Sequence, residues 1–136
     1  MSMRMPAAPL VLAMLALPHA AAAQPGCDPD GTQVEMNACA QDELAAADAE
    51  LNAVYRQVME LHKDEAVSVD RLRAAQRLWI QLRDADLEAR FPLAVGQDPR
   101  MVYGTIYPLE YASEKAELTR ARTQYLRTFL PAGAGR

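Results

Sequence analysis

Two long stretches of the chain lack both glycine and proline, and this absence limits the fold more than any other feature. Neither residue occurs from Thr32 through Phe91 or from Leu109 through Leu130. The two stretches hold most of the alanines that follow residue 23, and alanine is the strongest helix former. No segment shows the apolar–polar alternation of a strand. We therefore expect an all-α domain.

The helix signals predict three main helices in an up-down bundle. Thr32-Gln-Val-Glu35 is a capping box that starts the first helix. Residues 61–70 lose the helical periodicity and should contain a turn. Pro92 should end the second helix, and Pro108 suits the first turn of the third. The remaining residues, 92–108, are predicted to form one long loop.

Apolar residues at helical spacing predict which face of each helix is buried. Trp79 is the expected centre of the core. The predicted buried positions are Leu44, Ala47, Leu51, Val54, Val58 and Leu61 in the first helix, Leu72, Ala75, Trp79, Leu82 and Ala85 in the second, and Tyr111, Leu118, Tyr125 and Phe129 in the third.

The first 23 residues read as a secretory signal rather than as part of the fold. Seventeen of them are apolar, Arg4 precedes the apolar run, and Ala21-Ala22-Ala23 supplies an A-x-A cleavage site. Pro9 and Pro18 argue against a membrane-spanning helix, and no later segment is apolar enough to span. We expect a single domain at residues 24–136 that is periplasmic or secreted.

Export bears on the two cysteines, Cys27 and Cys39. The periplasm and the cell exterior are oxidising, which favours a disulfide between them over two free thiols. The spacing is not that of a C-x-x-C redox motif, so the predicted bond is structural.

Charge is distributed unevenly along the predicted mature chain. Residues 24–70 carry a net charge of −9, and residues 71–136 carry +4. The overall acidity and the absence of a basic stripe disfavour a nucleic-acid-binding protein. Either the acidic first helix pairs with basic neighbours within the molecule, or its exposed charges attract a cationic partner. In the second case Asp42, Glu43 and Glu50 are the expected contacts.

Catalytic chemistry is hard to assemble from these residues. After signal cleavage the chain retains His62 as its single histidine, and a lone histidine at a helix end is usually a solvated or capping residue. The sequence has no metal-ligand spacing, phosphate-binding loop or nucleophile elbow. We expect no enzyme activity, no cofactor and no metal.

The predicted 92–108 loop is long for a helical bundle and is a candidate binding element. Tyrosine combines rigid contact area with a hydroxyl group, which suits a protein interface. Tyr103 and Thr105 are the preferred contact candidates. Tyr107 either contacts a partner or folds back on the bundle, and Ile106 should fold back.

Three passages together resemble the LprI-type lysozyme-inhibitor domain found in small exported bacterial proteins. They are residues 27–40 with Glu-Met-Asn at 35–37, residues 72–85 with Arg-Asp-Ala at 83–85, and residues 104–122 with Glu-Leu-Thr at 117–119. The resemblance implies a small, disulfide-bonded helical domain, in a family named for a member that inhibits lysozyme.

The chain departs from that family at a second cysteine pair, whose positions are Leu87 and Glu114 here. A leucine opposite a glutamate does not replace a disulfide, so this region should be exposed or rearranged. Arg83 and Asp84, in the second matching passage, should have a structural role in inter-helix ion pairs and loop anchoring.

These features predict a protein-binding domain, most simply a stoichiometric inhibitor that blocks the active-site cleft of a lysozyme. Lysozymes are commonly basic, which fits the acidic first helix. The alternative is a cell-envelope module that binds another exported protein without inhibiting an enzyme.

The disulfide gives the first testable prediction. Mass spectrometry of the exported protein without reduction should find Cys27 bonded to Cys39 and no free thiol. Replacing either cysteine should lower the free energy of unfolding by about 3 kcal/mol, because the unfolded chain regains the freedom that the closed loop removes. Two thiols that react with an alkylating reagent in the native protein would contradict the prediction.

Overall fold

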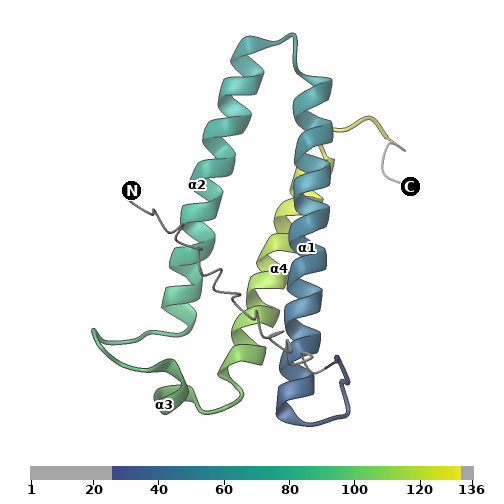
Figure 1. Cartoon of the computed structure of the whole chain (residues 1–136). Helices are drawn as coiled ribbons and strands as arrows, with labels where there is room; N and C mark the ends of the chain where they lie inside the picture. Colours follow the sequence, from purple (N-terminus) through teal and green to yellow (C-terminus); the bar gives the residue numbers. More distant parts are fainter. Residues whose placement is uncertain (1–25, 133–136) are drawn as a thin grey trace, which may run out of the picture.

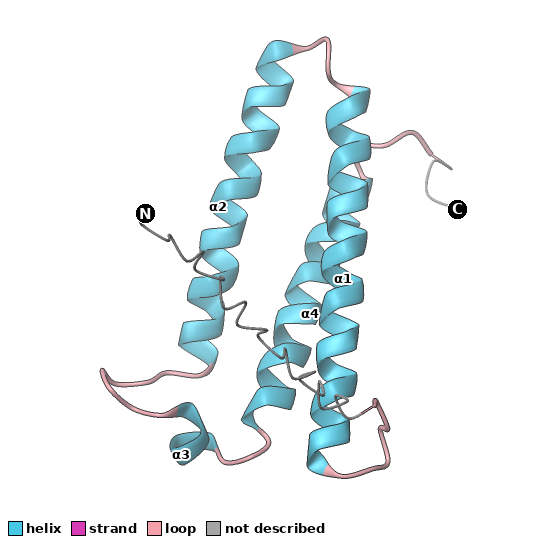
Figure 2. Ribbon diagram, viewed as in Figure 1, coloured by secondary structure: helices cyan, strands magenta, loops and turns pink. Residues whose placement is uncertain are grey.

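The computed structural model describes residues 26–132, and all regular secondary structure in that range is helical (Figure 1, Figure 2). The all-α class is therefore confirmed. The signal segment predicted at residues 1–23 lies outside the described residues. The helices are α1 (Gln33–Leu61), α2 (Ala66–Arg90), α3 (Pro99–Tyr103) and α4 (Tyr107–Arg127).

The breaks between helices follow the sequence signals, with one addition. The turn between α1 and α2 lies within residues 62–65, and α2 ends at Arg90, just before Pro92. Pro108 lies in the first turn of α4, as expected. The addition is α3, which interrupts the segment predicted to be loop throughout. Asp98 and Pro99 favour it, because they are good residues for a helix N-cap and first position.

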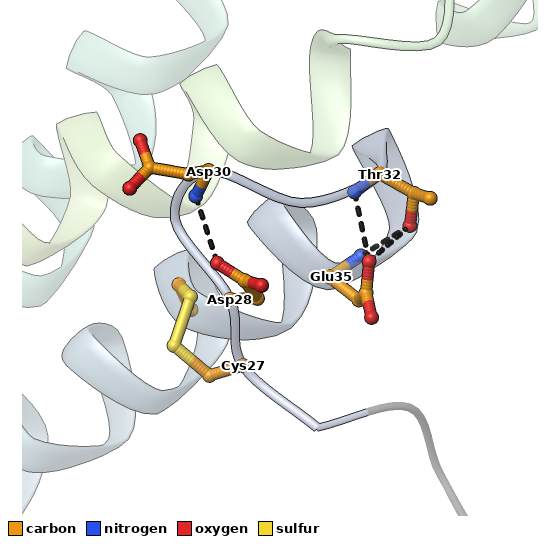
Figure 3. Close-up of a disulfide and its surroundings, with 6 residues drawn as sticks. Cys27, Asp28, Asp30, Thr32 and Glu35 are labelled. Carbon is orange, nitrogen blue, oxygen red and sulfur yellow. Dashed lines mark hydrogen bonds between the residues drawn. A yellow bond between two sulfur atoms is a disulfide. The ribbon is translucent and has the colours of Figure 1, made fainter.

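The capping box at the start of α1 is present as predicted (Figure 3). The Thr32 backbone N–H and hydroxyl both donate to Oε2 of Glu35 at 2.8 Å, and the Glu35 backbone N–H donates to the Thr32 hydroxyl oxygen. These hydrogen bonds, the backbone one first, lower the pKa of the Glu35 carboxyl. Gly31 leaves room for this carboxylate, since a Cβ there would lie 2.5 Å from Oε2.

The disulfide between Cys27 and Cys39 is also confirmed (Figure 3). Cys39 lies in the second turn of α1, and Cys27 lies in the segment that precedes the helix. A turn at residues 28–31 closes the loop between them, with the Asp30 backbone N–H donating to Oδ1 of Asp28. The bond therefore holds the exposed N-terminal segment against the first turns of α1.

The main interface of the molecule joins α1 to α4, which lie side by side (Figure 1). The buried stripe of α4 consists largely of alanine and threonine, and small side chains allow two helix backbones to approach closely. The threonines are compatible with burial in part because the Thr123 hydroxyl donates to the Thr119 carbonyl. The buried residues are Ala40, Ala47, Leu51, Val54 and Val58 on α1 and Ala112, Ala116, Thr119, Thr123 and Leu126 on α4.

The prediction of which face of the third helix is buried is partly wrong, because small residues rather than large apolar ones face α1. Tyr125 and Phe129 are exposed, and Tyr111 and Leu118 are only half-buried. The small-residue stripe faces α1 instead. Leu61, predicted to be buried on the first helix, is also exposed because it lies at the end of α1.

The expected face of α2 is rotated relative to the real one. Of the predicted positions, Leu72 is buried and Trp79 half-buried, but Ala75, Leu82 and Ala85 are exposed. The α2 backbone stands apart from that of α1 over most of its length (Figure 1), and Leu72 joins a core cluster with Leu51 of α1 and Leu126 of α4. The inward stripe of α2 consists of Leu72, Gln76, Trp79, Arg83 and Leu87.

Two polar residues in this inward stripe explain the rotation. The carbonyl oxygen of the Gln76 side chain accepts a hydrogen bond of 3.0 Å from Nε of Arg122 on α4. Arg122 and Arg83 both lie over the Trp79 ring, with guanidinium carbons 5.8 and 5.1 Å from the ring centre. Such contacts stabilise partly buried cations. A search of the sequence for an apolar stripe misses glutamine and arginine, because the aliphatic part of each side chain is apolar but its end is polar.

Trp79 and the Arg83–Asp84 pair have structural contacts that differ in detail from those expected. Trp79 packs on the core cluster that includes Leu51 and Leu126, but it is half-buried rather than fully enclosed. Arg83 donates to Oδ1 of Asp84 through Nε at 2.9 Å and Nη2 at 2.8 Å. This ion pair lies within α2 and does not join two helices.

The resemblance implies a second cysteine pair at Leu87 and Glu114, a region expected to be exposed or rearranged; the expected exposure is wrong for Leu87. Leu87 is 1% exposed and is one of the most completely buried side chains of the described chain. Glu114 is half-buried, and its Oε2 lies 3.9 Å from Nε of Arg90. Apolar packing at Leu87 therefore helps to hold the end of α2.

Burial at Leu87 gives the second prediction. Leu87→Ala should lower the free energy of unfolding by about 2–5 kcal/mol, because it removes buried methyl groups and leaves a cavity. Leu61→Ala is the matched control, since the same atoms are removed from a side chain that is 50% exposed; its cost should stay below about 1 kcal/mol. Chemical denaturation measures both. Equal losses would contradict the packing described for α2.

Candidate protein-interaction site

Four aromatic rings at the junction of α2, α3 and α4 fix the connection between α2 and α4. Phe91 lies at the end of α2 and meets the rings of Tyr103, Tyr107 and Tyr111 with centroid distances of 5.5–5.9 Å. Tyr103 and Tyr107 stack at 5.7 Å. Aromatic pairs in such geometries each contribute about 0.5–1.5 kcal/mol beyond their buried area. We call these four residues the aromatic cluster.

Hydrogen bonds stiffen the connection further. The Tyr103 hydroxyl donates to the Pro92 carbonyl at 2.7 Å, which ties α3 back to the end of α2. Oδ1 of Asp98 accepts from the Arg100 backbone N–H at 2.8 Å and caps α3. Gly104 ends α3 with a φ of 79°, a left-handed conformation that glycine adopts without strain. A connection held at this many points presents a defined surface.

The connection between α2 and α4 exposes several large apolar side chains. Val95 is fully exposed, Met101 is 85% exposed, and neighbouring large apolar side chains are also largely in solvent. Exposed apolar side chains gathered on one surface are typical of protein-interaction sites, whereas single ones carry little meaning. The apolar loop surface consists of Leu93, Val95, Met101, Val102 and Ile106.

An acidic pocket lies at the junction of α2, α3 and α4. Its volume is about 430 Å³, and its walls come from Arg90 and Phe91 at the end of α2, from Tyr103, and from the first half of α4. Phe91 and Tyr103 contribute two of its sides. Three glutamates line it, and among them Glu114 faces Arg90; the set is Glu110, Glu114 and Glu117. The surface therefore combines apolar contact area with a neighbouring negative charge.

The loop residues that were predicted to contact a partner differ in how exposed they are. Thr105 is exposed. Tyr103 and Tyr107 are half-buried in the aromatic cluster, and the Tyr103 hydroxyl is already bonded to Pro92. Burial raises the pKa of the Tyr107 hydroxyl, with further contributions from Tyr111 and Tyr103. The expectation that Ile106 folds back is wrong, because it is exposed.

The acidic residues predicted on the first helix are exposed, but two of them pair within the molecule. Glu43 accepts from Nη2 of Arg120 at 3.2 Å, and Glu50 pairs with Arg127. Both pairs cross from α1 to α4. Asp42 takes part in no ion pair within residues 26–132. Glu43 and Glu50 therefore fit the interpretation in which acidic residues pair within the molecule. Asp42 fits the interpretation in which an exposed charge attracts a partner.

Sequence reasoning missed both the apolar loop surface and the acidic pocket. The spacing of Glu110, Glu114 and Glu117 along α4 places them on one helix face, and this signal was available in the sequence. The apolar side chains of the loop carried no such signal. Their exposure depends on how the aromatic cluster turns the chain, which periodicity does not reveal.

Neither a metal site nor a catalytic arrangement emerges from the part of the chain that the structure describes. No group of three or more histidine, cysteine, aspartate or glutamate side chains is placed to hold a metal ion in residues 26–132. Nδ1 of His62 lies 3.5 Å from Oε2 of Glu65 in the turn after α1, far along the chain from the aromatic cluster.

Comparison with known proteins gives the family. Residues 25–126 match the family described as "Lysozyme inhibitor LprI". The chain belongs to the LprI family. An uncharacterised protein of Rhizobium meliloti (strain 1021) is 33% identical over 138 aligned positions, which cover 92% of this chain and 93% of the relative. No solved structure matches the chain.

The residues that match the family include every part of the candidate interaction site. The LprI match includes the disulfide, the end of α2, the apolar loop surface and the acidic pocket. The LprI family is one of inhibitor domains rather than enzymes, and the relative from Rhizobium meliloti carries no functional name.

The hydrogen bond between Tyr103 and Pro92 gives the third prediction. Tyr103→Phe keeps the ring but removes the donor, so the free energy of unfolding should fall by about 0.5–1.5 kcal/mol. Amide hydrogen exchange in residues 93–102 should become faster. Tyr111→Phe is the matched control, because that hydroxyl makes no hydrogen bond among the described residues. Unchanged exchange in Tyr103→Phe would show that the bond does not hold the loop.

Proposed function

We propose that this protein is a stoichiometric inhibitor of lysozyme that binds through the apolar loop surface and blocks the active-site cleft. The observation that carries the proposal is the exposure of Val95 and Met101 on a connection fixed by the aromatic cluster. LprI membership gives the class of partner.

The physical requirement for inhibition is modest. A glycosidase of this type holds two carboxylates on either side of the bond that it cleaves, in a cleft that must admit a polysaccharide. An inhibitor therefore needs only to fill the cleft. The connection around α3 lies at one end of the molecule (Figure 1). Because it is already ordered, it loses little conformational entropy on binding.

Contacts at short range come from two kinds of group. Val95, Met101 and Ile106 supply the apolar area, and a small cluster of such residues commonly carries most of the affinity of an interface. Thr105 lies among them and offers a hydroxyl. Tyr103 and Tyr107 support this surface from below and contribute the exposed parts of their rings.

Charge gives attraction at long range and complementarity at the rim. The acidic pocket fits an arginine or lysine side chain of a basic lysozyme. Asp42, Glu43 and Glu50 extend the negative charge along α1. Exposed charges of this kind raise the association rate more than they slow dissociation, and salt screens their effect. Asp42 is the cleanest test of them, since Glu43 and Glu50 also join α1 to α4.

The place of action is the periplasm or the cell exterior, which is where lysozymes meet bacteria. The disulfide fits an oxidising compartment. In residues 26–132 no helix has the length and apolar character needed to cross a membrane. The predicted secretory signal, cleaved after Ala23, would export the domain to this compartment. The proposed inhibition needs no cofactor or metal.

The fourth prediction tests the function directly. The mature protein should inhibit peptidoglycan lysis by at least one basic lysozyme at a ratio near one to one. Val95→Asp and Met101→Asp should each weaken inhibition by at least about tenfold, because each places a carboxylate in an apolar contact. Inhibition constants from turbidity assays with titrated protein measure the effect.

Val67→Asp is the matched control for this test, since Val67 is a 75% exposed valine in the first turn of α2, at the opposite end of that helix from the apolar loop surface (Figure 1). It should inhibit as well as the wild type. Failure of the wild-type protein to bind or inhibit a panel of lysozymes at low salt would refute the proposal. The same surface would then be sought on a different exported protein, as a non-inhibitory envelope module.

A further inference from the structure

The outer side of α2 carries an apolar stripe that the fold leaves uncovered. Its residues recur at alternating intervals of four and three, the spacing by which helices pair along a seam. The two leucines at its centre are conspicuously exposed, Leu78 at 65% and Leu82 at 59%. The α2 stripe consists of Ala75, Leu78, Leu82, Ala85 and Ala89, and Arg71 continues it one turn earlier; all six are exposed.

This stripe is distinct from the face that holds α2 in the molecule. At 3.6 residues per turn, the centre of the α2 stripe lies about a third of a turn around the helix from the centre of the inward residues Leu72, Trp79 and Leu87. The stripe is also separate from the apolar loop surface, which begins after α2 has ended. Its alanines would let another helix approach closely, while its leucines supply the apolar area.

We propose that the α2 stripe pairs with the α2 stripe of a second copy of this chain, with the two helices antiparallel. Reversing one helix about a two-fold axis near residue 80 sets Leu78 opposite Leu82 of the second copy and Leu82 opposite Leu78. The same register sets Ala75 opposite Ala85 at both ends. Two leucine pairs then fill the centre, with alanine contacts on either side.

Charge selects this antiparallel arrangement. Three of the four charged residues in the first half of α2, residues 66–78, are arginines, whereas aspartate and glutamate predominate in residues 79–90. The antiparallel register brings Arg71 of each copy beside Ala89 and Glu88 of the other. Within residues 26–132 neither Arg71 nor Glu88 makes an ion pair, so both are available. A parallel pair would instead place Arg71 beside Arg71.

The complementarity makes a second copy the best occupant of the stripe. An isologous contact needs one surface that fits itself, and the stripe meets this condition in both shape and charge. The inference does not depend on the proposed function, because the stripe and the apolar loop surface share no residue. Loss of dimerisation and loss of lysozyme inhibition are therefore separately measurable.

The oligomeric state tests the proposal. Sedimentation of the purified mature protein, over concentrations from micromolar to millimolar, should show a monomer that converts to a dimer. Leu78→Glu with Leu82→Glu should remain monomeric throughout, with an unchanged circular dichroism spectrum to show that it folds. Val95→Glu, on the apolar loop surface, is the matched control and should dimerise like the wild type. A wild-type protein that stays monomeric would overturn the proposal, as would a dimer that persists in the double variant.

Two further variants test the antiparallel register. Arg71→Glu should weaken the dimer, and adding Glu88→Arg should restore it, because the charges are exchanged across the interface. Gln81→Cys lies close to the two-fold axis, so a short bifunctional maleimide should join two copies through it. Ala45→Cys, exposed on α1, should not cross-link. Cross-linking at both sites, or no rescue by Glu88→Arg, would contradict this register.

Discussion

The close packing of α1 against α4 is the interaction on which the rest of the structure depends. It joins residues far apart in the sequence through a stripe of alanines and threonines on α4 and larger apolar side chains on α1. Ion pairs from Glu43 to Arg120 and from Glu50 to Arg127 border the same interface. Since surface ion pairs contribute little, the buried stripe supplies most of the stability. The capping box and the disulfide then fix the beginning of α1.

The position of α2 and of the interaction site follows from this interface. With α4 held by α1, its first turn supplies Tyr107 and Tyr111 at a fixed place, and Phe91 at the end of α2 packs on them. The aromatic cluster therefore determines where the chain between Pro92 and Ile106 runs. The packed pair of α1 and α4 thereby stabilises the connection between α2 and α4, which has few buried residues of its own. The outer stripe of α2 remains uncovered because α2 needs only its inner stripe to attach.

Local signals in the sequence predicted the local features well. Thr32 and Glu35 encode the capping box, Pro92 and Pro108 bound the connection, and the two cysteines form the expected disulfide. Each of these depends on residues near one another in the chain. Burial was harder to predict where the partner surface decides it. Leu82 looked like a core residue from its spacing, yet it is exposed, because helix α2 attaches partly through Gln76, which accepts a hydrogen bond from Arg122 on α4.

The candidate site shows the same limit. Tyr103, Thr105 and Tyr107 were singled out as contact candidates, but their chemistry did not reveal that Tyr103 bonds to Pro92. The exposure of Val95 and Met101 depends on the path of a connection whose ends are held by the aromatic cluster. The buried position of Leu87 was likewise hidden, since a leucine in place of a family cysteine has no local signature of burial. Tertiary contacts decide these features.

Chemical-shift mapping with an inhibited lysozyme tests the central claim, that the fixed apolar loop surface is the binding element. Nitrogen–proton correlation spectra of the labelled mature protein would be recorded as unlabelled lysozyme is added. The account predicts that the largest shifts fall on residues 93–106 and on the first turns of α4 around Glu110 and Glu114. Shifts confined to α1 or to the outer stripe of α2, with the 93–106 amides unchanged, would contradict it.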